Sequence, residues 1–444
     1  TGASPKHSFY LGVGYSYEQG NIEHEKFSKV TINASNDYKI TDYLKVGFQF
    51  NGARTLPADS KQVLGALRAA PIAPVYNKEY GLYSVLPEFQ KAQINNPMVD
   101  VDLKANTTKA ENYRASGNIY GEVDFLKHFN FKAMFSMDYA SNNGRTYQPI
   151  VKVYDPTVSG NIATLGTGKT EVSQFKENET KVQSDYVLTY TNSFGDHNLT
   201  ATAGFTTYYN SLSRLDAARG QGIGLVIPDN PDKWFVSIGD LATATNGSTQ
   251  WERTTVSFLG RVIYNYKGKY LLEATVRADA ASNFAPENRW GYFPSVSAGW
   301  MISEENFMKG ASKWLSMLKL RASYGQTGNS NVGYRIYDYY EVGRNAIIGG
   351  AESTGVYASD LGNKSITWET TTEFNLGVDF GIFNNRFKLA AEYFKRKITD
   401  LLVTNKPLPF YNEVNKIAGN IGSTQSQGVE ITLNTVNIVT KDFE

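Results

Sequence analysis

The sequence has no cysteine, no long apolar run and no excess of charge of either sign. Without cysteine no disulfide can stabilise the fold, and an exported protein would need another source of stability, such as a large closed, hydrogen-bonded sheet. The longest apolar candidates, such as Ile223 to Ile227, are far shorter than the roughly 18 residues of a transmembrane helix. Lys and Arg number 44 against 43 Asp and Glu, with no strongly basic stretch, which argues against a nucleic-acid partner.

The sequence does contain a repeated unit of about ten residues in which apolar and polar side chains alternate. One such unit has Tyr270, Leu272, Ala274, Val276 and Ala278 on one face, and Glu273, Thr275, Arg277 and Asp279 on the other. The same period of two recurs in segments beginning at Tyr113, Leu199 and Trp368. A period of two indicates strands, and each is roughly long enough to cross the hydrocarbon when tilted.

The connections between these units are alternately short and long. The expected tight turns lie at 39–42, 126–128, 195–197, 266–269 and 381–385, and the expected long loops, rich in Gly, Pro, Asn and Ser, lie at 56–110, 141–178, 211–250 and 327–364. Aromatic pairs such as Phe125 and Phe129 bracket the tight turns, as in an interfacial girdle. A soluble β-sandwich gives no reason for this sorting of loop lengths.

These patterns predict an all-β fold, an antiparallel transmembrane β-barrel of which residues 1–444 form one continuous segment. The short turns would lie at the periplasmic rim and the long loops would be extracellular. We count about fourteen strands, fewer than the roughly 22 of a plugged transporter. With no signal peptide and no plug domain recognisable, the sequence is interpreted as the middle of a longer protein.

No arrangement of residues favours an enzyme, a metal site or a cofactor. The run Gly166 to Thr170 imitates the end of a phosphate-binding loop but lacks the earlier glycine, which is Ala163 here. The four histidines are dispersed and not at metal-ligand spacing. Glu304 and Glu305 are adjacent in a polar connection, where we expect a solvated acidic turn rather than a glycosidase pair.

Several longer runs resemble the SusC/RagA family of TonB-dependent outer-membrane transporters. They are RWGYFPSVSAGW at 289–300, LKLRASYGQTG at 318–328, WETTTEFNLG at 368–377, YFKRKITDLL at 393–402, and NIGS at 420–423 followed by QGVE at 427–430. A weaker likeness extends to the first strands, so the resemblance covers most of the chain.

The resemblance implies active import of oligosaccharides or peptides across the outer membrane of a Gram-negative bacterium of the Bacteroides type. It implies a SusD-like surface lipoprotein as a lid, energy from TonB-ExbB-ExbD received through an N-terminal region that these residues lack, contact with outer-membrane lipid, and a dimer of importer–lid pairs. The candidate ligand contacts are the loop aromatics Tyr76, Tyr80, Trp234 and Tyr337, whose flat rings can stack on sugars. Alternatively, such rings pack a loop or face the lid.

Three other functions fit parts of the pattern. A passive porin would share the alternation, the girdle and the loop lengths, and only an upstream plug domain would separate the two. A surface adhesin or a soluble all-β binding protein would be extracted without detergent. A glycan hydrolase is the least supported, because no pair of carboxylates has the required arrangement.

Overall fold

The computed structural model describes residues 1–59, 64–91, 93–409, 414 and 416–437. In this part of the chain, 15 strands form one sheet in the order β1-β2-β3-β4-β7-β8-β11-β12-β13-β14-β15-β16-β19-β20-β23. Their bounds are β1 Gly2–Ala3, β2 His7–Gln19, β3 Lys26–Lys39, β4 Leu44–Leu56, β7 Thr108–Phe125, β8 Phe129–Gln148, β11 Glu171–Phe194, β12 His197–Gly220, β13 Thr245–Tyr266, β14 Tyr270–Ala281, β15 Trp290–Met301, β16 Leu315–Asn329, β19 Glu369–Ile382, β20 Phe387–Thr399 and β23 Ser423–Thr435.

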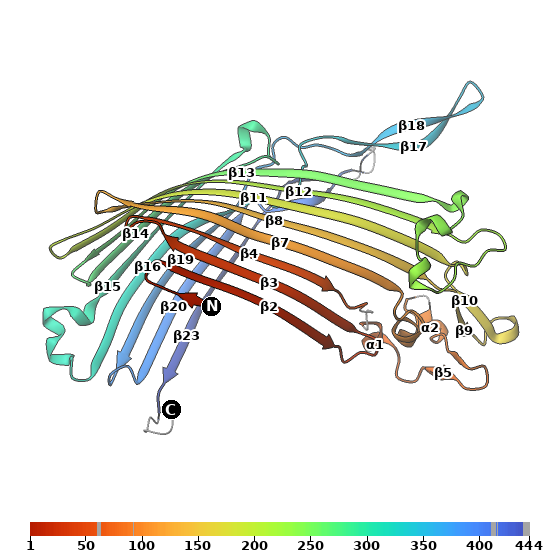
Figure 1. The fold of residues 1–444 in the computed structure, drawn as a ribbon, viewed down its shortest axis with the longest axis horizontal. Helices are drawn as coiled ribbons and strands as arrows, with labels where there is room; N and C mark the ends of the chain where they lie inside the picture. The colour runs from red at the N-terminus through yellow and green to blue at the C-terminus, as the bar shows by residue number, and fades with distance from the viewer. Residues whose placement is uncertain (60–63, 92, 410–413, 415, 438–444) are drawn as a thin grey trace.

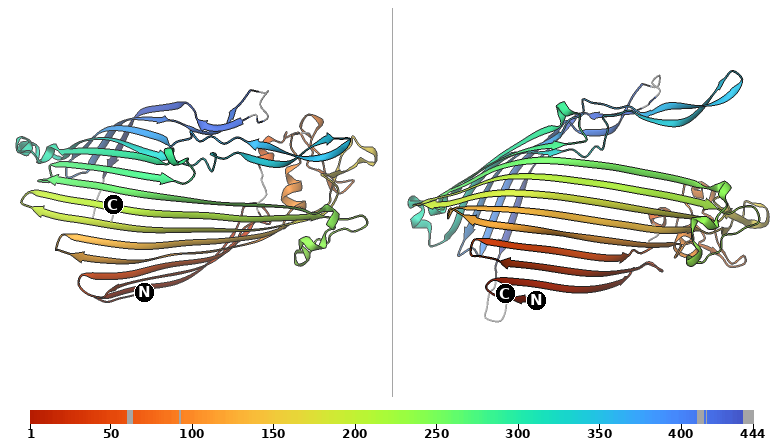
Figure 2. Two further views of the ribbon diagram at one scale, coloured as in Figure 1. Left: turned by 90° about the horizontal axis from the view of Figure 1, so that it is seen from above. Right: turned by 45° about the horizontal axis from the view of Figure 1, so that its top comes forward.

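The sheet is an antiparallel meander that bends into an arch, with β2 and β23 near its two open edges (Figures 1 and 2). Apart from the two-residue β1, its strands are long, which confirms the expected fourteen. Among the described residues, β23 pairs with β20 and does not pair with the strands at the opposite edge of the sheet. The described strands therefore form part of a barrel wall. No helix in these residues is long and apolar enough to cross a membrane.

The alternation predicted from the sequence separates an apolar from a polar face. On the apolar face Leu11, Val13 and Ile119 are 65%, 74% and 61% exposed. An apolar surface this continuous is untenable in water and suits lipid. On the other face Arg261 pairs with Glu273 at 2.9 Å. The sheet therefore has no core of its own, because its apolar side chains face outward.

The strands are longer than expected, so two predicted loop ranges were too wide and a third was displaced. Strand β8 continues to Gln148 and β11 begins at Glu171, which shortens the loop predicted at 141–178 to 149–170. Likewise 211–250 becomes 221–244, and 327–364 shifts to 330–368. A strand crosses the hydrocarbon in about 9–11 residues. Beyond that depth both faces become polar, the alternation disappears, and the sequence reads as a loop although the hydrogen-bonded ladder continues.

The loops gather at one end of the sheet and carry the short elements seen in Figure 1. These are α1 Leu64–Arg68, β5 Tyr76–Asn77, β6 Leu82–Tyr83, α2 Glu88–Lys91, β9 Val151–Tyr154, β10 Ile162–Leu165, β17 Tyr339–Ile348, β18 Ala351–Asp360, β21 Leu402–Pro407 and β22 Lys416–Asn420. The loop predicted at 56–110 lies at 57–107, except that 60–63 and 92 are outside the described residues. The connection 400–422 was not predicted as a long loop.

The buried apolar residues lie mainly in this loop layer. Trp368, expected from the alternation to be the first apolar residue of a strand, precedes β19 and is only 8% exposed. Its ring contacts Phe284 and Phe293, with both centroid distances 5.4 Å. The assignment was wrong because the period of two was extended one residue past the start of the strand.

Aromatic rings form a belt at the turn end. Phe129 contacts Phe125 and Tyr190 at centroid distances of 5.5 and 5.0 Å. On β12 and β13, the ring centroids of His197 and Tyr266 are 4.6 Å apart. This histidine therefore belongs to the aromatic belt. The predicted pairing of rings around tight turns is confirmed in these contacts, and its position suits a membrane interface.

Candidate functional site

The polar face of the sheet is the candidate functional surface, and the register explains its continuity. Residues opposite each other on neighbouring strands share a face. Asn118 lies opposite Gln49 on one side and Ser136 on the other, and Asp185 lies opposite Thr206. In a closed transmembrane barrel such a face lines the interior.

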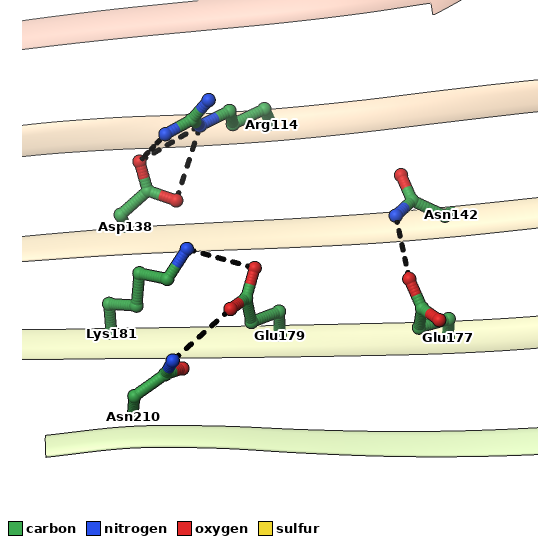
Figure 3. Close-up of polar contacts among 7 residues, drawn as sticks. All are labelled: Arg114, Asp138, Asn142, Glu177, Glu179, Lys181 and Asn210. Atoms are coloured by element: carbon green, nitrogen blue, oxygen red, sulfur yellow. Dashed lines mark hydrogen bonds and ion pairs between the residues drawn. The ribbon is translucent and has the colours of Figure 1, made fainter. Parts of the chain in front are cut away.

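Separate groups of charged and amide side chains from β7, β8, β11 and β12 contact one another on this face (Figure 3). Arg114 donates from Nε and Nη2 to Asp138 Oδ2, at 2.9 and 2.7 Å. Lys181 pairs with Glu179 at 3.0 Å, and Asn210 donates to the same carboxylate at 3.3 Å. These polar groups thus hold one another in place along the wall.

A second network is centred on Arg321 of β16. Its guanidinium pairs with Asp379 at 3.4 Å and with Glu392 from the strand beyond. Both residues opposite Arg321 are glycines, Gly299 and Gly377. A Cβ at Gly377 would lie 2.7 Å from Arg321 Cζ. The glycine therefore makes room for the arginine to lie along the wall and reach two carboxylates.

An aromatic ring takes up a similar space nearer the loop end. Phe175 lies opposite Gly144, where an added Cβ would be 2.3 Å from the ring. The Arg214 guanidinium lies 4.6 Å from the Phe175 centroid and pairs with Glu177 at 3.1 Å and Asp216 at 2.8 Å. A ring held between glycine and arginine fixes the position of that cation.

Toward the turn end the polar face contains a groove of about 450 Å³. Small side chains form part of its lining, among them Ser297, Gly299 and Ser323, and charged ends reach it from Glu273 and Lys319. Larger apolar side chains, among them Ile263 and Leu271, also line the groove. The groove therefore offers charged and hydrogen-bonding groups beside apolar ones.

The predicted loop contacts are not brought together as one site. Tyr76 in β5 is 47% exposed, with its ring 5.3 Å from Tyr83. Tyr80 packs on Tyr154 at 5.0 Å and accepts a hydrogen bond from Asn161. Both belong to the loop 57–107.

The other two predicted residues differ sharply in exposure. Tyr337, between β16 and β17, is 59% exposed. Trp234 is 1% exposed, and its ring stacks on Tyr147 at 5.4 Å with 8° between the planes. In this conformation Trp234 presents no ring face to a ligand and instead anchors the loop 221–244. This is the alternative role that the sequence left open for such rings.

Glu305, expected to be solvated, is a half-buried hydrogen-bond acceptor at the turn end. Its carboxylate accepts hydrogen bonds from Tyr270 Oη at 2.7 Å, Trp300 Nε1 at 3.1 Å and Lys269 Nζ at 3.1 Å. These donors, Tyr270 first, lower the pKa of Glu305 from 4.5 to about 2. These contacts could not be recognised from the sequence, because Tyr270 begins β14, Trp300 lies in β15 and Lys269 lies in the turn before β14.

The hydrogen bonds of Glu305 should make the connection 302–314 sensitive to acid. Because the folded-state pKa is lowered, the stabilisation is present above pH 4.5 and is lost as the pH falls toward about 2. Glu305→Gln should open the connection at neutral pH, detected as faster proteolysis at 302–314 in the full-length protein. Glu304→Gln, at the exposed neighbour, is the control, and equal proteolysis of the two variants would contradict this role.

Comparison with known proteins identifies the family. A family model described as "TonB dependent receptor-like, beta-barrel" matches residues 87–440. The chain belongs to the TonB-dependent receptor β-barrel family. TonB-dependent receptor P3 of Formosa agariphila is 30% identical over 456 residues, covering 100% of this chain and 43% of that protein. TonB-dependent receptor SusC of Bacteroides thetaiotaomicron is 28% identical over 464 residues, which cover 98% of this chain and 44% of that protein.

Two solved structures, of a peptide importer and of a siderophore receptor, show the same fold. The RagAB peptide importer in its "closed-closed" state aligns with a TM-score of 0.77 at 22% identity, covering 99% of this chain and 48% of that chain. The siderophore receptor PirA of Acinetobacter baumannii aligns with a TM-score of 0.55 at 13% identity. The alignment covers 97% of this chain and 55% of that chain. This chain thus spans less than half the length of its sequence relatives.

Membership confirms the predicted SusC/RagA-like resemblance and the partial antiparallel barrel. TonB-dependent receptors of this family are outer-membrane proteins, so this chain is part of a barrel wall in the outer membrane of a Gram-negative bacterium. The family consists of receptors and transporters, not enzymes. Its relatives in Formosa and Bacteroides agree with the bacterial group expected from the sequence.

Proposed function

We propose that the complete protein is a SusC-like active importer that moves oligosaccharides or peptides across the outer membrane with energy from TonB. The observation that supports it best is the continuous polar face, whose charges are paired across strands while the opposite face is apolar. Such a wall offers hydrogen-bonding groups to a hydrophilic solute without leaving many unpaired charges to trap it. The similarity to the TonB-dependent receptor SusC supports energy-dependent import, and the similarity to the RagAB peptide importer supports peptides as one of the two substrate classes.

The proposed partners follow from the same relatives. A SusD-like surface lipoprotein would cap the loop end, TonB-ExbB-ExbD would act through a region beyond these residues, and two importer–lid pairs would form a dimer. The long loops would be extracellular. Among the predicted loop aromatics, Tyr76 and Tyr337 are the exposed rings that could meet substrate, Tyr80 would contribute the edge of its packed ring, and Trp234 would contribute only if its loop moved.

Uptake by cells tests this proposal. A deletion strain carrying the full-length gene should take up labelled oligosaccharide or peptide mixtures, and deletion of tonB should abolish that uptake. Uptake that persists without TonB or without the proton gradient would contradict active import and favour a passive porin.

A matched pair of variants tests the role of the polar face. Ser136 lies on the polar face of β8, and the neighbouring Phe135, 45% exposed, lies on the apolar face. Ser136→Trp should narrow the path and lower uptake several-fold, whereas Phe135→Trp should leave uptake unchanged at equal abundance in the outer membrane. Equal uptake by the two variants would remove this face from the proposed path.

A further inference from the structure

A second polar–apolar site lies in the loop layer, away from the polar face of the sheet. Here the loop 57–107 packs against the β9–β10 hairpin, where Val85 donates a backbone hydrogen bond to Tyr154 at 2.9 Å. Between the two segments is a pocket of about 200 Å³, which we call the loop pocket. It is lined by side chains of both segments, so it exists only when they are packed together.

The walls of the loop pocket are mostly aliphatic. Leu86, Val99 and Val153 line it and are 4%, 0% and 1% exposed. Val85 and Leu165 pack against this cluster from the two segments. Space of this size with apolar walls can hold a group as large as a benzene ring.

Among the buried side-chain polar atoms of the described residues that line the loop pocket, one has no hydrogen-bond partner. Ser84 lines the pocket and is 2% exposed, and its Oγ has no hydrogen-bond partner. The neighbouring Asn96 is saturated, since its Nδ2 donates to Val75 O and Ser84 O, both at 2.8 Å, and its Oδ1 accepts from Met98 N at 3.1 Å. The Ser84 hydroxyl is therefore the group available to a ligand, because buried hydroxyls are normally hydrogen-bonded.

The charge of the loop pocket is already compensated. Asp155, 2% exposed, pairs with Lys91 at 2.9 Å and accepts from Thr157 N and Oγ1 at 3.0 and 2.6 Å. These contacts, Thr157 first, lower the pKa of Asp155 to about 2. A charged ligand would have to disrupt this ion pair or be buried without a partner, so a neutral ligand is favoured.

We propose that the loop pocket binds a neutral apolar group of about six to eight non-hydrogen atoms that carries one hydroxyl, with this hydroxyl bonded to Ser84 Oγ. A phenol ring has this chemistry, either as a free phenol or as a tyrosine side chain of a peptide. The loop pocket shares no residue with the polar face or with the predicted loop contacts Tyr76 and Tyr80.

Ligand-observed fluorine NMR tests the loop pocket in the full-length protein, with 4-fluorophenol added to protein in lipid nanodiscs. We expect line broadening of 4-fluorophenol that unlabelled phenol reverses. Ser84→Ala should weaken 4-fluorophenol binding about tenfold, the loss of one hydrogen bond, and should not affect fluorobenzene. Ala163→Leu, which fills the pocket from β10, should remove binding of both probes.

The comparison among variants separates line broadening caused by binding in the loop pocket from line broadening caused by partition into lipid. Partition into lipid is the same in every sample. Equal broadening by wild type, Ser84→Ala and Ala163→Leu would overturn the proposal, as would no broadening by wild type. Competition by N-acetyl-tyrosine amide as strong as that by phenol would identify a tyrosine side chain as an accepted source of the ring. Competition by phenol alone would restrict the pocket to free phenols.

Discussion

Ile119→Arg should destabilise the assembled barrel by about 2–4 kcal/mol if the residue lies near the bilayer midplane. Ile119 is 61% exposed on the apolar face, between Phe48 and Phe135 on the neighbouring strands. An arginine there must leave its charge in hydrocarbon or thin the bilayer around it. Urea-dependent folding of the full-length protein into lipid vesicles measures the change.

Asn118→Arg is the matched control, one residue earlier on the same strand. Asn118 lies on the polar face between Gln49 and Ser136, so an arginine at 118 can remain in water. Its free energy of unfolding should change by less than about 0.5 kcal/mol. If both variants lost equal stability, the assignment of the two faces would be wrong.

Trp368→Ala should cost about 3–5 kcal/mol, the usual penalty for emptying a buried aromatic site. Besides its ring contacts with Phe284 and Phe293, the Trp368 indole donates to Arg289 O at 3.0 Å. The same cluster includes Ala418 of the loop 400–422. Losing the ring should therefore loosen several loops at once.

The effect of Trp368→Ala should be confined to the loop end. Hydrogen exchange should accelerate in 282–289, 330–338 and 416–420, while the β7–β12 ladders keep their protection. Trp314→Ala is the control, because Trp314 lies at the turn end and is 47% exposed. Unchanged exchange in the three loop segments would contradict the role of the cluster.

Sequence patterns predicted the sheet well because lipid imposes a strict period of two. Leu272 and Val276 alternate with Glu273 and Arg277 because one face of the strand contacts lipid and the other face contacts water. The tight turns follow from the same constraint. The ends of the strands could not be predicted in this way. Beyond the membrane a strand is held by backbone hydrogen bonds to its neighbours, and these leave no pattern in the side chains.

The polar networks could not be predicted, because register joins residues far apart in the chain. Arg321, Asp379 and Glu392 come from three strands and meet only when the pairings are fixed. Glu305 and Trp234 illustrate the same limit, since an acidic residue in a connection and a tryptophan in a loop have no local feature that reveals their partners. Such contacts depend on tertiary packing alone.

Labelling of single cysteines along β7 is the most direct test of the central claim, that this sheet is a membrane-spanning wall with a hydrophilic inner face. This part of the protein has no cysteine, so each introduced thiol is unique within it. In outer membranes, cysteine at 114, 116, 118 and 120 should react with a water-soluble maleimide. At 115, 119 and 121, a fluorophore attached to the cysteine should be quenched by lipids that carry a nitroxide. Reaction without this alternation would contradict the account.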